Sequence, residues 1–254
     1  MNHTIDLNVD MGESFGLYSY GSDKEIIRSV SSANLACGFH AGDPTVMRNS
    51  VELAGAYEVA IGAHFGFRDL TGFGRRSLHM KPVDLKNDTT YQLGALGAFL
   101  QAAKLRMQHV KPHGALYMMA LEDEEISVPI VEASLEFNSN LMIYTIAGSA
   151  TEAVATKKGM RVVREFFADR PYFVDGRVKM FDWTLEQVAP DHAGIAQRVV
   201  RLVKEGVIPS MDGTDVEMKA ETVCVHSDTP RSSEIAAGIR AALDAEGIDI
   251  RPPD

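Results

Sequence analysis

Short apolar runs alternate along the chain with longer segments in which apolar residues recur at helical spacing. The short runs, each followed by turn or polar residues, predict β-strands. Seven such strands are expected, at 4–10, 32–37, 59–64, 108–113, 141–147, 161–167 and 221–227. The longer segments predict helices at 44–57, 89–105, 126–137, 148–159, 192–206 and 232–247.

Alternation of strand and helix is typical of parallel strands joined by right-handed crossovers. Seven such units in 254 residues, without a linker or a break in composition, favour one domain spanning 1–254 and folded as a seven-stranded parallel β/α barrel. An open, doubly wound sheet is the alternative. We expect 71–84 to form a long loop, and a loop of this length in a compact domain is usually functional.

The charge balance argues against two classes of partner. The chain carries 25 basic and 35 acidic residues, a formal net charge of -10, whereas nucleic acids and anionic membranes bind basic surfaces. No apolar run approaches the roughly 20 residues that span a bilayer, and no signal peptide is apparent, so we expect a cytoplasmic protein. Cys37 and Cys224 lie in apolar runs, which favours buried free thiols over a disulfide.

Ionisable or hydrogen-bonding residues follow every predicted strand. In chain order they are Asp10 and Glu13; His40 and Asp43; His64, Arg68 and Asp69; Lys111 and His113; Gly148 and Ser149; Asp169 and Arg170; His226 and Asp228. Because the C-terminal ends of parallel barrel strands share one face, these residues are expected to converge there. Their joint placement favours a functional site over unrelated surface residues.

The stretch ANLACGFHAGD, residues 33–43, places His40 on a tight turn. Gly38 and Gly42 permit backbone geometry, or close approach of a ligand, that a side chain forbids. Plainer interpretations exist for single residues, since Asp43 precedes a proline and predicts a helix cap, and Lys111 can be a solvated charge. Four histidines lack a strand-end position and are interpreted as structural or solvent-facing: His3, His79, His109 and His192.

Several familiar catalytic motifs are absent from the sequence, among them the Walker A phosphate loop and the HExxH and CxxC metal motifs. Asp10, His40, His64 and His113 have the mixed nitrogen and oxygen donors that bind a divalent metal. Ligands drawn from different strands leave no diagnostic spacing, so the sequence leaves the metal open.

Six sequence blocks resemble, in this order, the LamB/YcsF family. They are DLNVDMGESFG (6–16), SANLACGFHAGDPTVM (32–47), AIGAHFGFRDLTGFGRR (60–76), QHVKPHGALY (108–117), FADRPY (167–172) and KAETVCVHSDTP (219–230). The resemblance covers nearly the whole chain. It implies a barrel of the glycoside hydrolase/deacetylase type, in agreement with the strands expected from the pattern.

The resemblance also implies an activity, that of the A component of an ATP-dependent 5-oxoprolinase, which opens the lactam 5-oxoproline to L-glutamate with partner subunits B and C. ATP is then a co-substrate that the partner subunits can bind. The implied catalytic roles are His64 and Asp10 as general base and orienting partner, Lys111 as oxyanion stabiliser, and His40 and His113 in substrate positioning or acid catalysis.

The residues expected to bind substrate are Glu13, Asp43, Arg75, Arg76, Asp169, Arg170, His226 and Asp228. Arg75 or Arg76 is expected to hold the substrate carboxylate by a bidentate contact. Two alternatives stay open: a metal-dependent deacetylase-like hydrolase acting on an N-acyl substrate, and a non-catalytic subunit that binds a small acid.

The chain departs from the family pattern mainly in one segment. Residues 177–190 read RVKMFDWTLEQVAP, where the family has an arginine and a Ser-Gln-Pro-Gly turn. Phe65 and Arg68 each stand where the family has proline, and Ser227 replaces a glycine. The altered segment is expected on the substrate side of the site, which keeps open a paralogue acting on another lactam or cyclic amide.

Overall fold

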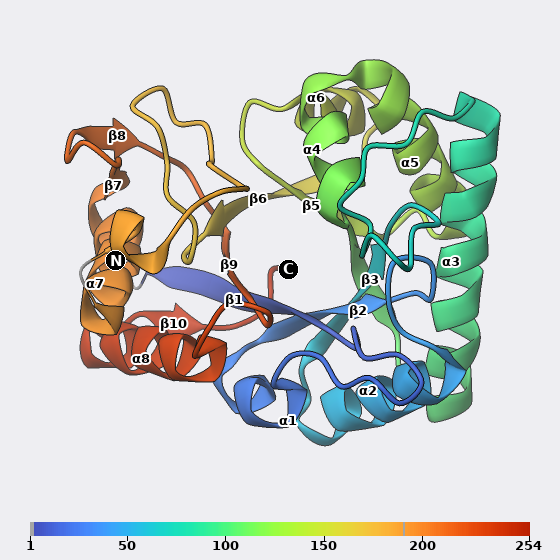
Figure 1. The fold of residues 1–254 in the computed structure, drawn as a ribbon, viewed down its shortest axis with the longest axis horizontal. Helices are drawn as coiled ribbons and strands as arrows, with labels where there is room; N and C mark the ends of the chain where they lie inside the picture. The colour runs from blue at the N-terminus through green and yellow to red at the C-terminus, as the bar shows by residue number, and fades with distance from the viewer. Residues whose placement is uncertain (1–2, 190) are drawn as a thin grey trace.

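A closed barrel of seven parallel strands forms the centre of the computed structural model, which describes residues 3–189 and 191–254 (Figure 1). The strands are β1 (Thr4–Met11), β2 (Ser32–Ala36), β3 (Ala60–Phe65), β4 (Met107–Pro112), β5 (Met142–Thr145), β6 (Arg161–Phe167) and β9 (Thr222–His226). Each pairs with the next in this order, and β1 pairs with β9 to close the ring, with Asp10 opposite His226. The barrel predicted from the sequence is therefore confirmed, and the open sheet is not formed.

Helices surround the barrel (Figure 1). Six occupy the predicted segments: α2 (Pro44–Ala56), α3 (Pro82–Ala103), α5 (Glu124–Phe137), α6 (Ala150–Lys157), α7 (His192–Glu205) and α8 (Ser232–Ala245). The start of α3 was expected at residue 89, but the helix begins at Pro82, because proline is favoured in the first turn of a helix. The loop expected at 71–84 is correspondingly shorter.

Several short elements are not expected from the sequence pattern. They are α1 (Asp23–Ile26), α4 (Gly114–Glu122), the 3-10 turns η1 (Ile27–Ser29) and η2 (Leu185–Gln187), and the strands β7 (Val207–Pro209), β8 (Asp215–Glu217) and β10 (Asp249–Ile250). In α4, with the sequence GALYMMALE, apolar residues lie all round the helix, so it lacks an amphipathic period. In the described part of the chain, no helix is long and apolar enough to cross a membrane.

Strand β1 shows how the sequence builds both the core and the site. Ile5, Leu7 and Val9 lie in the main hydrophobic cluster, and burying such a side chain stabilises the fold by about 1.5–3 kcal/mol. Because successive strand residues point to opposite faces, Asp6 and Asn8 alternate with them and are also buried. The inside of the barrel is therefore polar and needs internal hydrogen bonds.

Two asparagines carry this polar network toward the C-terminal ends of the strands. Asn8 Nδ2 donates to Glu165 Oε1 over 3.1 Å and to Thr222 Oγ1 over 2.7 Å. Asn34 Nδ2 donates to Asn8 Oδ1 over 2.7 Å and to Asp10 Oδ1 over 2.8 Å. The network thus holds the two carboxylates, on β6 and β1, that face the site.

Candidate active site at the C-terminal ends of the strands

A small cavity of about 140 Å³ lies at the C-terminal ends of the barrel strands. Residues predicted from the sequence line it: Asp10, His64, Arg75, Lys111, His113, Arg170, His226 and Asp228. Strands β1, β3, β4 and β9 each contribute to this set, because parallel strands end on one face of a barrel. The convergence expected from the sequence is thus present for these residues.

The ammonium group of Lys111 lies on the floor of the cavity and is 2 % exposed. Its Nζ is 3.0 Å from Asp10 Oδ1, 2.9 Å from Glu165 Oε1 and 3.1 Å from Cys224 Sγ. Burial alone lowers the pKa of a lysine, but these three neighbours outweigh it and hold the pKa of Lys111 well above its usual value. Lys111 is therefore a fixed positive charge.

Asp10 is the carboxylate that joins Lys111 to the neighbouring histidines. Its Oδ2 lies 3.5 Å from His64 Nε2 and 3.9 Å from His226 Nε2. Burial tends to raise the pKa of Asp10, but His64 and Lys111 outweigh it and hold this pKa well below the usual value. Asp10 thus remains ionised beside the ammonium group.

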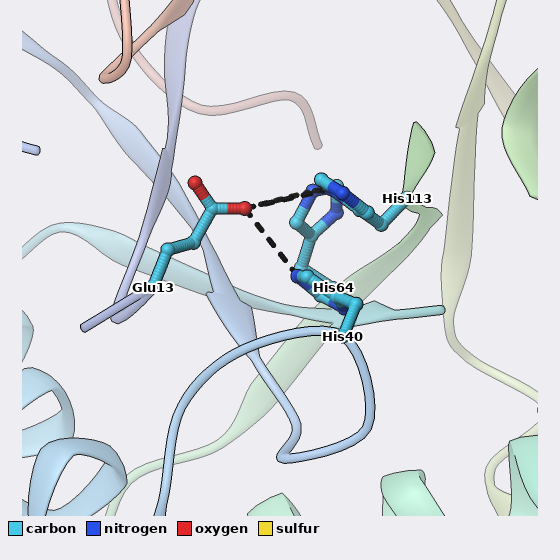
Figure 2. A group of neighbouring side chains, drawn as sticks. All are labelled: Glu13, His40, His64 and His113. Atoms are coloured by element: carbon cyan, nitrogen blue, oxygen red, sulfur yellow. Dashed lines mark hydrogen bonds and ion pairs between the residues drawn. The ribbon is translucent and has the colours of Figure 1, made fainter. Parts of the chain in front are cut away.

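Glu13 and three histidines form a second cluster at the edge of the cavity. Figure 2 shows the Glu13 carboxylate directed toward the imidazoles of His40 and His113, which lie 3.3 and 3.4 Å from its Oε1. The fourth member is His64. Burial disfavours the charged form of each of these groups. It raises the pKa of Glu13 to about 8. It lowers the pKa of His40 and of His113 to about 3, and it lowers the pKa of His64 well below its usual value.

Two backbone carbonyls fix the tautomers of His64 and His113. His64 Nδ1 lies 3.0 Å from the carbonyl oxygen of Lys111, and His113 Nε2 lies 2.8 Å from that of Phe73. A carbonyl oxygen only accepts, so each of these ring nitrogens carries the hydrogen. The other two nitrogens, His64 Nε2 and His113 Nδ1, carry lone pairs.

Donor atoms of the cluster Glu13, His40, His64 and His113 all lie within 4.8 Å of one another, so this buried group could hold a metal ion. Asp10, Cys224 and His226 satisfy the same distance criterion. Between Asp10 and Cys224, however, the ammonium group of Lys111 already supplies the positive charge. The histidine cluster is therefore the better metal candidate of the two.

His226 belongs to a buried hydrogen-bond network centred on Asp169, which is 0 % exposed. Its Nδ1 donates to Asp169 Oδ1 over 2.9 Å, and its backbone N–H donates to Asp169 Oδ2 over 3.0 Å. Arg170 Nη1 lies 2.9 Å from the same Oδ2. Burial tends to raise the pKa of Asp169, but Arg170 and His226 hold it below the usual value. The ionised Asp169 orients His226 so that its Nε2 carries the lone pair.

Two arginines line the wall of the cavity. Arg75 forms an ion pair with Asp228, and Arg170 packs against Trp183 with 4.3 Å between its guanidinium carbon and the ring centroid. Within the described part of the chain, the Nε of Arg170 is buried without a hydrogen-bond partner. A buried donor in this state is available to a ligand.

Apolar residues from the altered segment 177–190 form part of the cavity wall. Met180, Phe181 and Trp183 line the cavity. Of this segment, Pro190 lies outside the described residues. The segment that departs from the family pattern thus contributes directly to the cavity wall.

Glycines let two loops approach the histidine cluster. Gly38 and Gly42, which flank His40, have φ of 94° and 79°, as their position in the sequence suggested. In the loop after β3, Gly74 has φ of 64°, and a Cβ there would lie 2.7 Å from His40 Cβ and 2.8 Å from His113 Cδ2. A side chain at position 74 would therefore force this loop away from the two imidazoles.

Four of the residues expected to bind substrate do not line the cavity: Glu13, Asp43, Arg76 and Asp169, whose network with His226 is described above. Asp43 caps α2 instead, and its side chain accepts hydrogen bonds from the backbone N–H groups of Thr45, Val46 and Gly16 over 2.8–2.9 Å. The side chain of Arg76 is 64 % exposed and pairs with Asp69. Glu13, which is also absent from the cavity wall, belongs to the histidine cluster behind it.

Some residues of the site are missed by the sequence reasoning. Glu165 lies in the middle of β6, where a charged residue inside the run RVVREFF was the available signal, and Tyr117 donates to its Oε2 over 3.0 Å. Cys224 is a buried free thiol, as expected, but it also contacts Lys111. Trp183 gives no sequence signal beyond its place in the altered segment.

Comparison with known proteins identifies relatives along almost the full length of the chain. The model of the LamB/YcsF family matches residues 5–254. The chain is 45 % identical over 248 residues to the A component of a 5-oxoprolinase from Pyrococcus furiosus, covering 98 % of this chain and 97 % of the relative. It is 46 % identical over 248 residues to the corresponding protein of Heliobacterium modesticaldum, covering 97 % of each.

A solved structure shares both sequence and fold with this chain. The lactam utilization protein from Thermus thermophilus superposes with a TM-score of 0.90 at 43 % identity, over 98 % of this chain and 99 % of that one. A polysaccharide deacetylase of Bacillus cereus, at 13 % identity and a TM-score of 0.53, shows a likeness of fold alone. From the family match and the full-length identity of its relatives, the chain belongs to the LamB/YcsF family.

Proposed function

We propose that this chain is the ring-opening subunit of an ATP-dependent 5-oxoprolinase, which converts 5-oxoproline to L-glutamate with partner subunits B and C. The names of its relatives and of the lactam utilization protein support this substrate class. One observation carries the proposal. A single small cavity contains the buried ammonium group of Lys111 and an imidazole, His226, whose Nε2 is free.

The chemistry explains why ATP is needed. An unstrained amide is a poor electrophile, and the five-membered ring of 5-oxoproline closes again readily. Transfer of the γ-phosphoryl group of ATP to the amide oxygen makes the ring carbon more electrophilic. Water then adds to this carbon and the C–N bond breaks, which gives γ-glutamyl phosphate with a protonated free amine. A second water releases phosphate from this acyl phosphate and gives glutamate. Since the sequence has no Walker A loop, we assign this transfer to the partner subunits and the attack by water to this chain.

His226 is the proposed general base. Asp169 holds its Nδ1–H, so Nε2 can take a proton from water as the water attacks the ring carbon. His64, the base expected from the sequence, is 1 % exposed, and its Nε2 faces His113 at 2.9 Å. The side chain of His226 is 13 % exposed and lines the cavity, so it is better placed to meet water.

Lys111 is proposed to stabilise the negative charge that develops on the oxygen of the reacting carbon. Its three N–H groups face Asp10, Glu165 and Cys224, and the thiol sulfur is the weakest of these acceptors. The N–H that faces Cys224 is therefore the one that a substrate oxygen can take over. Asp10 and Glu165 keep the ammonium group charged and in place.

The substrate carboxylate is proposed to bind the two wall arginines. Arg75 lines the cavity, and Arg170 offers an unpartnered, buried Nε. Guanidinium groups suit a carboxylate because they donate two parallel hydrogen bonds. The methylene groups of the ring would then face Phe181 and Trp183 on the apolar side of the cavity.

Reconstitution with omissions tests the proposal. The chain is mixed with its cognate B and C subunits, 5-oxoproline and ATP, and glutamate and ADP are measured with each component left out in turn. We expect glutamate only from the complete mixture. Hydrolysis of an N-acyl sugar without ATP would indicate a deacetylase instead, and 5-oxoproline binding without turnover in the assembled complex would indicate a binding subunit.

A further inference from the structure

Two imidazole nitrogens in the histidine cluster face each other with no hydrogen between them. His64 Nε2 and His113 Nδ1 are 2.9 Å apart. In both rings the hydrogen is on the other nitrogen, which donates to a backbone carbonyl. Two lone pairs at this distance repel each other unless a positive species lies between them.

The carboxylate of Glu13 points to the same place. Its Oε1 is buried and has no hydrogen-bond partner in the structure. It lies 3.3 Å from His40 Nε2, 3.4 Å from His113 Nδ1 and 4.0 Å from His64 Nε2. A proton shared by the nitrogens of His64 and His113 would leave this oxygen unsatisfied, and a proton on this oxygen would serve only one of the two nitrogens. Either arrangement leaves a buried polar atom unpaired. A metal ion between this oxygen and the two nitrogens satisfies all three atoms.

His40 differs from the other two histidines in geometry. Its ring is stacked on that of His113, with 3.8 Å between centroids and 5° between planes. An imidazole binds a metal near its own ring plane, so one ion cannot lie in the planes of two parallel rings. Among the described residues, neither ring nitrogen of His40 has a hydrogen-bond partner. Its Nε2 lies 3.3 Å from Glu13 Oε1, but no backbone carbonyl holds its ring in a metal-binding tautomer, as the carbonyls do for His64 and His113. His40 is thus a neighbour of the three converging atoms.

We infer that Glu13 Oε1, His64 Nε2 and His113 Nδ1 bind one divalent transition-metal ion, with Zn²⁺ as the preferred ion. Two histidines and one glutamate form a ligand set that suits zinc and leaves a coordination position open. Ligand bonds of about 2.0–2.2 Å place ligand atoms roughly 3–4 Å apart, and the three observed separations are 2.9, 3.4 and 4.0 Å.

The surroundings of the three ligands fit this assignment. The carbonyls of Lys111 and Phe73 hold the two imidazoles in the metal-binding tautomer, as the outer partners of metal-bound histidines do. His64 and His113 also line the cavity, so the ion would lie beside the proposed ring-opening site. The inference goes beyond that function, since neither the lactam nor ATP enters it.

Metal binding by the full-length chain tests the inference without an activity assay. The protein is stripped with a chelator and dialysed, then titrated with Co²⁺ and, separately, with Zn²⁺. We expect about one ion per chain by elemental analysis, visible absorption bands of bound Co²⁺, and a higher melting temperature with Zn²⁺. A stripped wild-type chain that binds neither ion would overturn the inference.

Variants identify the ligands. His64→Ala, His113→Ala and Glu13→Gln are expected to weaken binding by about 100-fold or more, beyond the ~10–100-fold that loss of an outer partner costs. His40→Ala should keep the ion within about 10-fold of wild type, and His79→Ala, at an exposed position, is the control. Equal losses in His40→Ala and His64→Ala, or full binding in His64→Ala and His113→Ala, would overturn the three-ligand assignment.

Folding of each variant is checked by circular dichroism and a thermal melt. If an alanine variant does not fold, the conservative His64→Gln or His113→Gln replaces it, and the wild-type Co²⁺ titration still decides whether the ion binds. A chain that binds one ion but opens no lactam in the reconstituted complex would contradict the proposed function and leave this inference intact.

Discussion

Nδ1 of His226 donates to Oδ1 of Asp169 over 2.9 Å, which leaves the lone pair of the histidine on Nε2, 3.9 Å from Oδ2 of Asp10. The two residues come from different strand ends, 57 positions apart in the sequence. Asp169 is fully buried and also binds Arg170, so its position is fixed from several sides. The roles proposed for this site depend on that orientation.

Asp169→Asn tests the orientation of the histidine directly. An amide at this position can donate to His226 Nδ1 and so favour the wrong tautomer. We expect kcat for glutamate formation to fall by about 10²- to 10⁴-fold while KM changes little. Asp175→Asn, an exposed carboxylate paired with Arg177, is the matched control. A wild-type kcat in Asp169→Asn would show that the pair has no catalytic role.

Lys111→Met tests the charge balance on the cavity floor. Removal of the ammonium group leaves Asp10 and Glu165 buried without their shared partner, and breaking a buried ion pair typically costs about 3–5 kcal/mol. We therefore expect a large loss in the free energy of unfolding, measured by urea denaturation. The double variant Lys111→Met, Glu165→Gln should recover part of this loss because it removes one of the two unpaired charges. Simple additivity of the two single effects would contradict this explanation.

Arg75 and Arg76 are adjacent in sequence, but of the two only Arg75 lines the cavity. Arg75→Lys should raise KM for 5-oxoproline about 10- to 100-fold, because a lysine cannot reproduce a bidentate contact with a carboxylate. Arg76→Lys serves as the control and should leave KM near the wild-type value, since Arg76 pairs with Asp69 on the surface. The reverse result would assign the carboxylate to Arg76 and contradict the observed cavity.

Asp23 gives a prediction about stability and pH. Burial raises its pKa to about 6 in the folded chain, above the usual value of 3.8. The folded state thus binds this proton more tightly than the unfolded state does. This tighter binding stabilises the fold fully below pH ~4, and the stabilisation is lost as the pH rises through 6.

Asp23→Asn removes this titration and retains an oxygen that can accept from the backbone N–H of Gly12. We expect the variant to be more stable than wild type at pH 7, by up to about 3 kcal/mol, with the difference shrinking toward pH 4. Urea denaturation at several pH values measures this. Parallel stability curves for the two proteins would show that Asp23 does not titrate as described.

The order of strands and helices could be predicted because each long element has a clear period. The short elements could not, since α4 is apolar on all sides and β7 and β8 are three residues each. Such segments lack a period long enough to detect. The predicted start of α3 was wrong because the predicted loop extended across Pro82, the residue at which the helix begins.

The candidate site was partly predictable for a related reason. Strand ends converge in a parallel barrel, so Asp10, Lys111 and His226 could be grouped from their positions alone. Glu165 could not, because it lies inside a strand and reaches the site through the barrel interior. The sequence also cannot tell which of two neighbouring arginines faces the cavity, since that depends on the path of the loop.

The most direct test of the proposed role is glutamate formation by the reconstituted complex carrying His226→Gln. Assembly with subunits B and C and binding of 5-oxoproline are measured on the same sample. We expect intact assembly and binding, with glutamate formation at least about 100-fold slower than wild type. Glutamate formation at the wild-type rate in the assembled variant would contradict the assignment of the base to His226 and, with it, the ring-opening role proposed for this cavity.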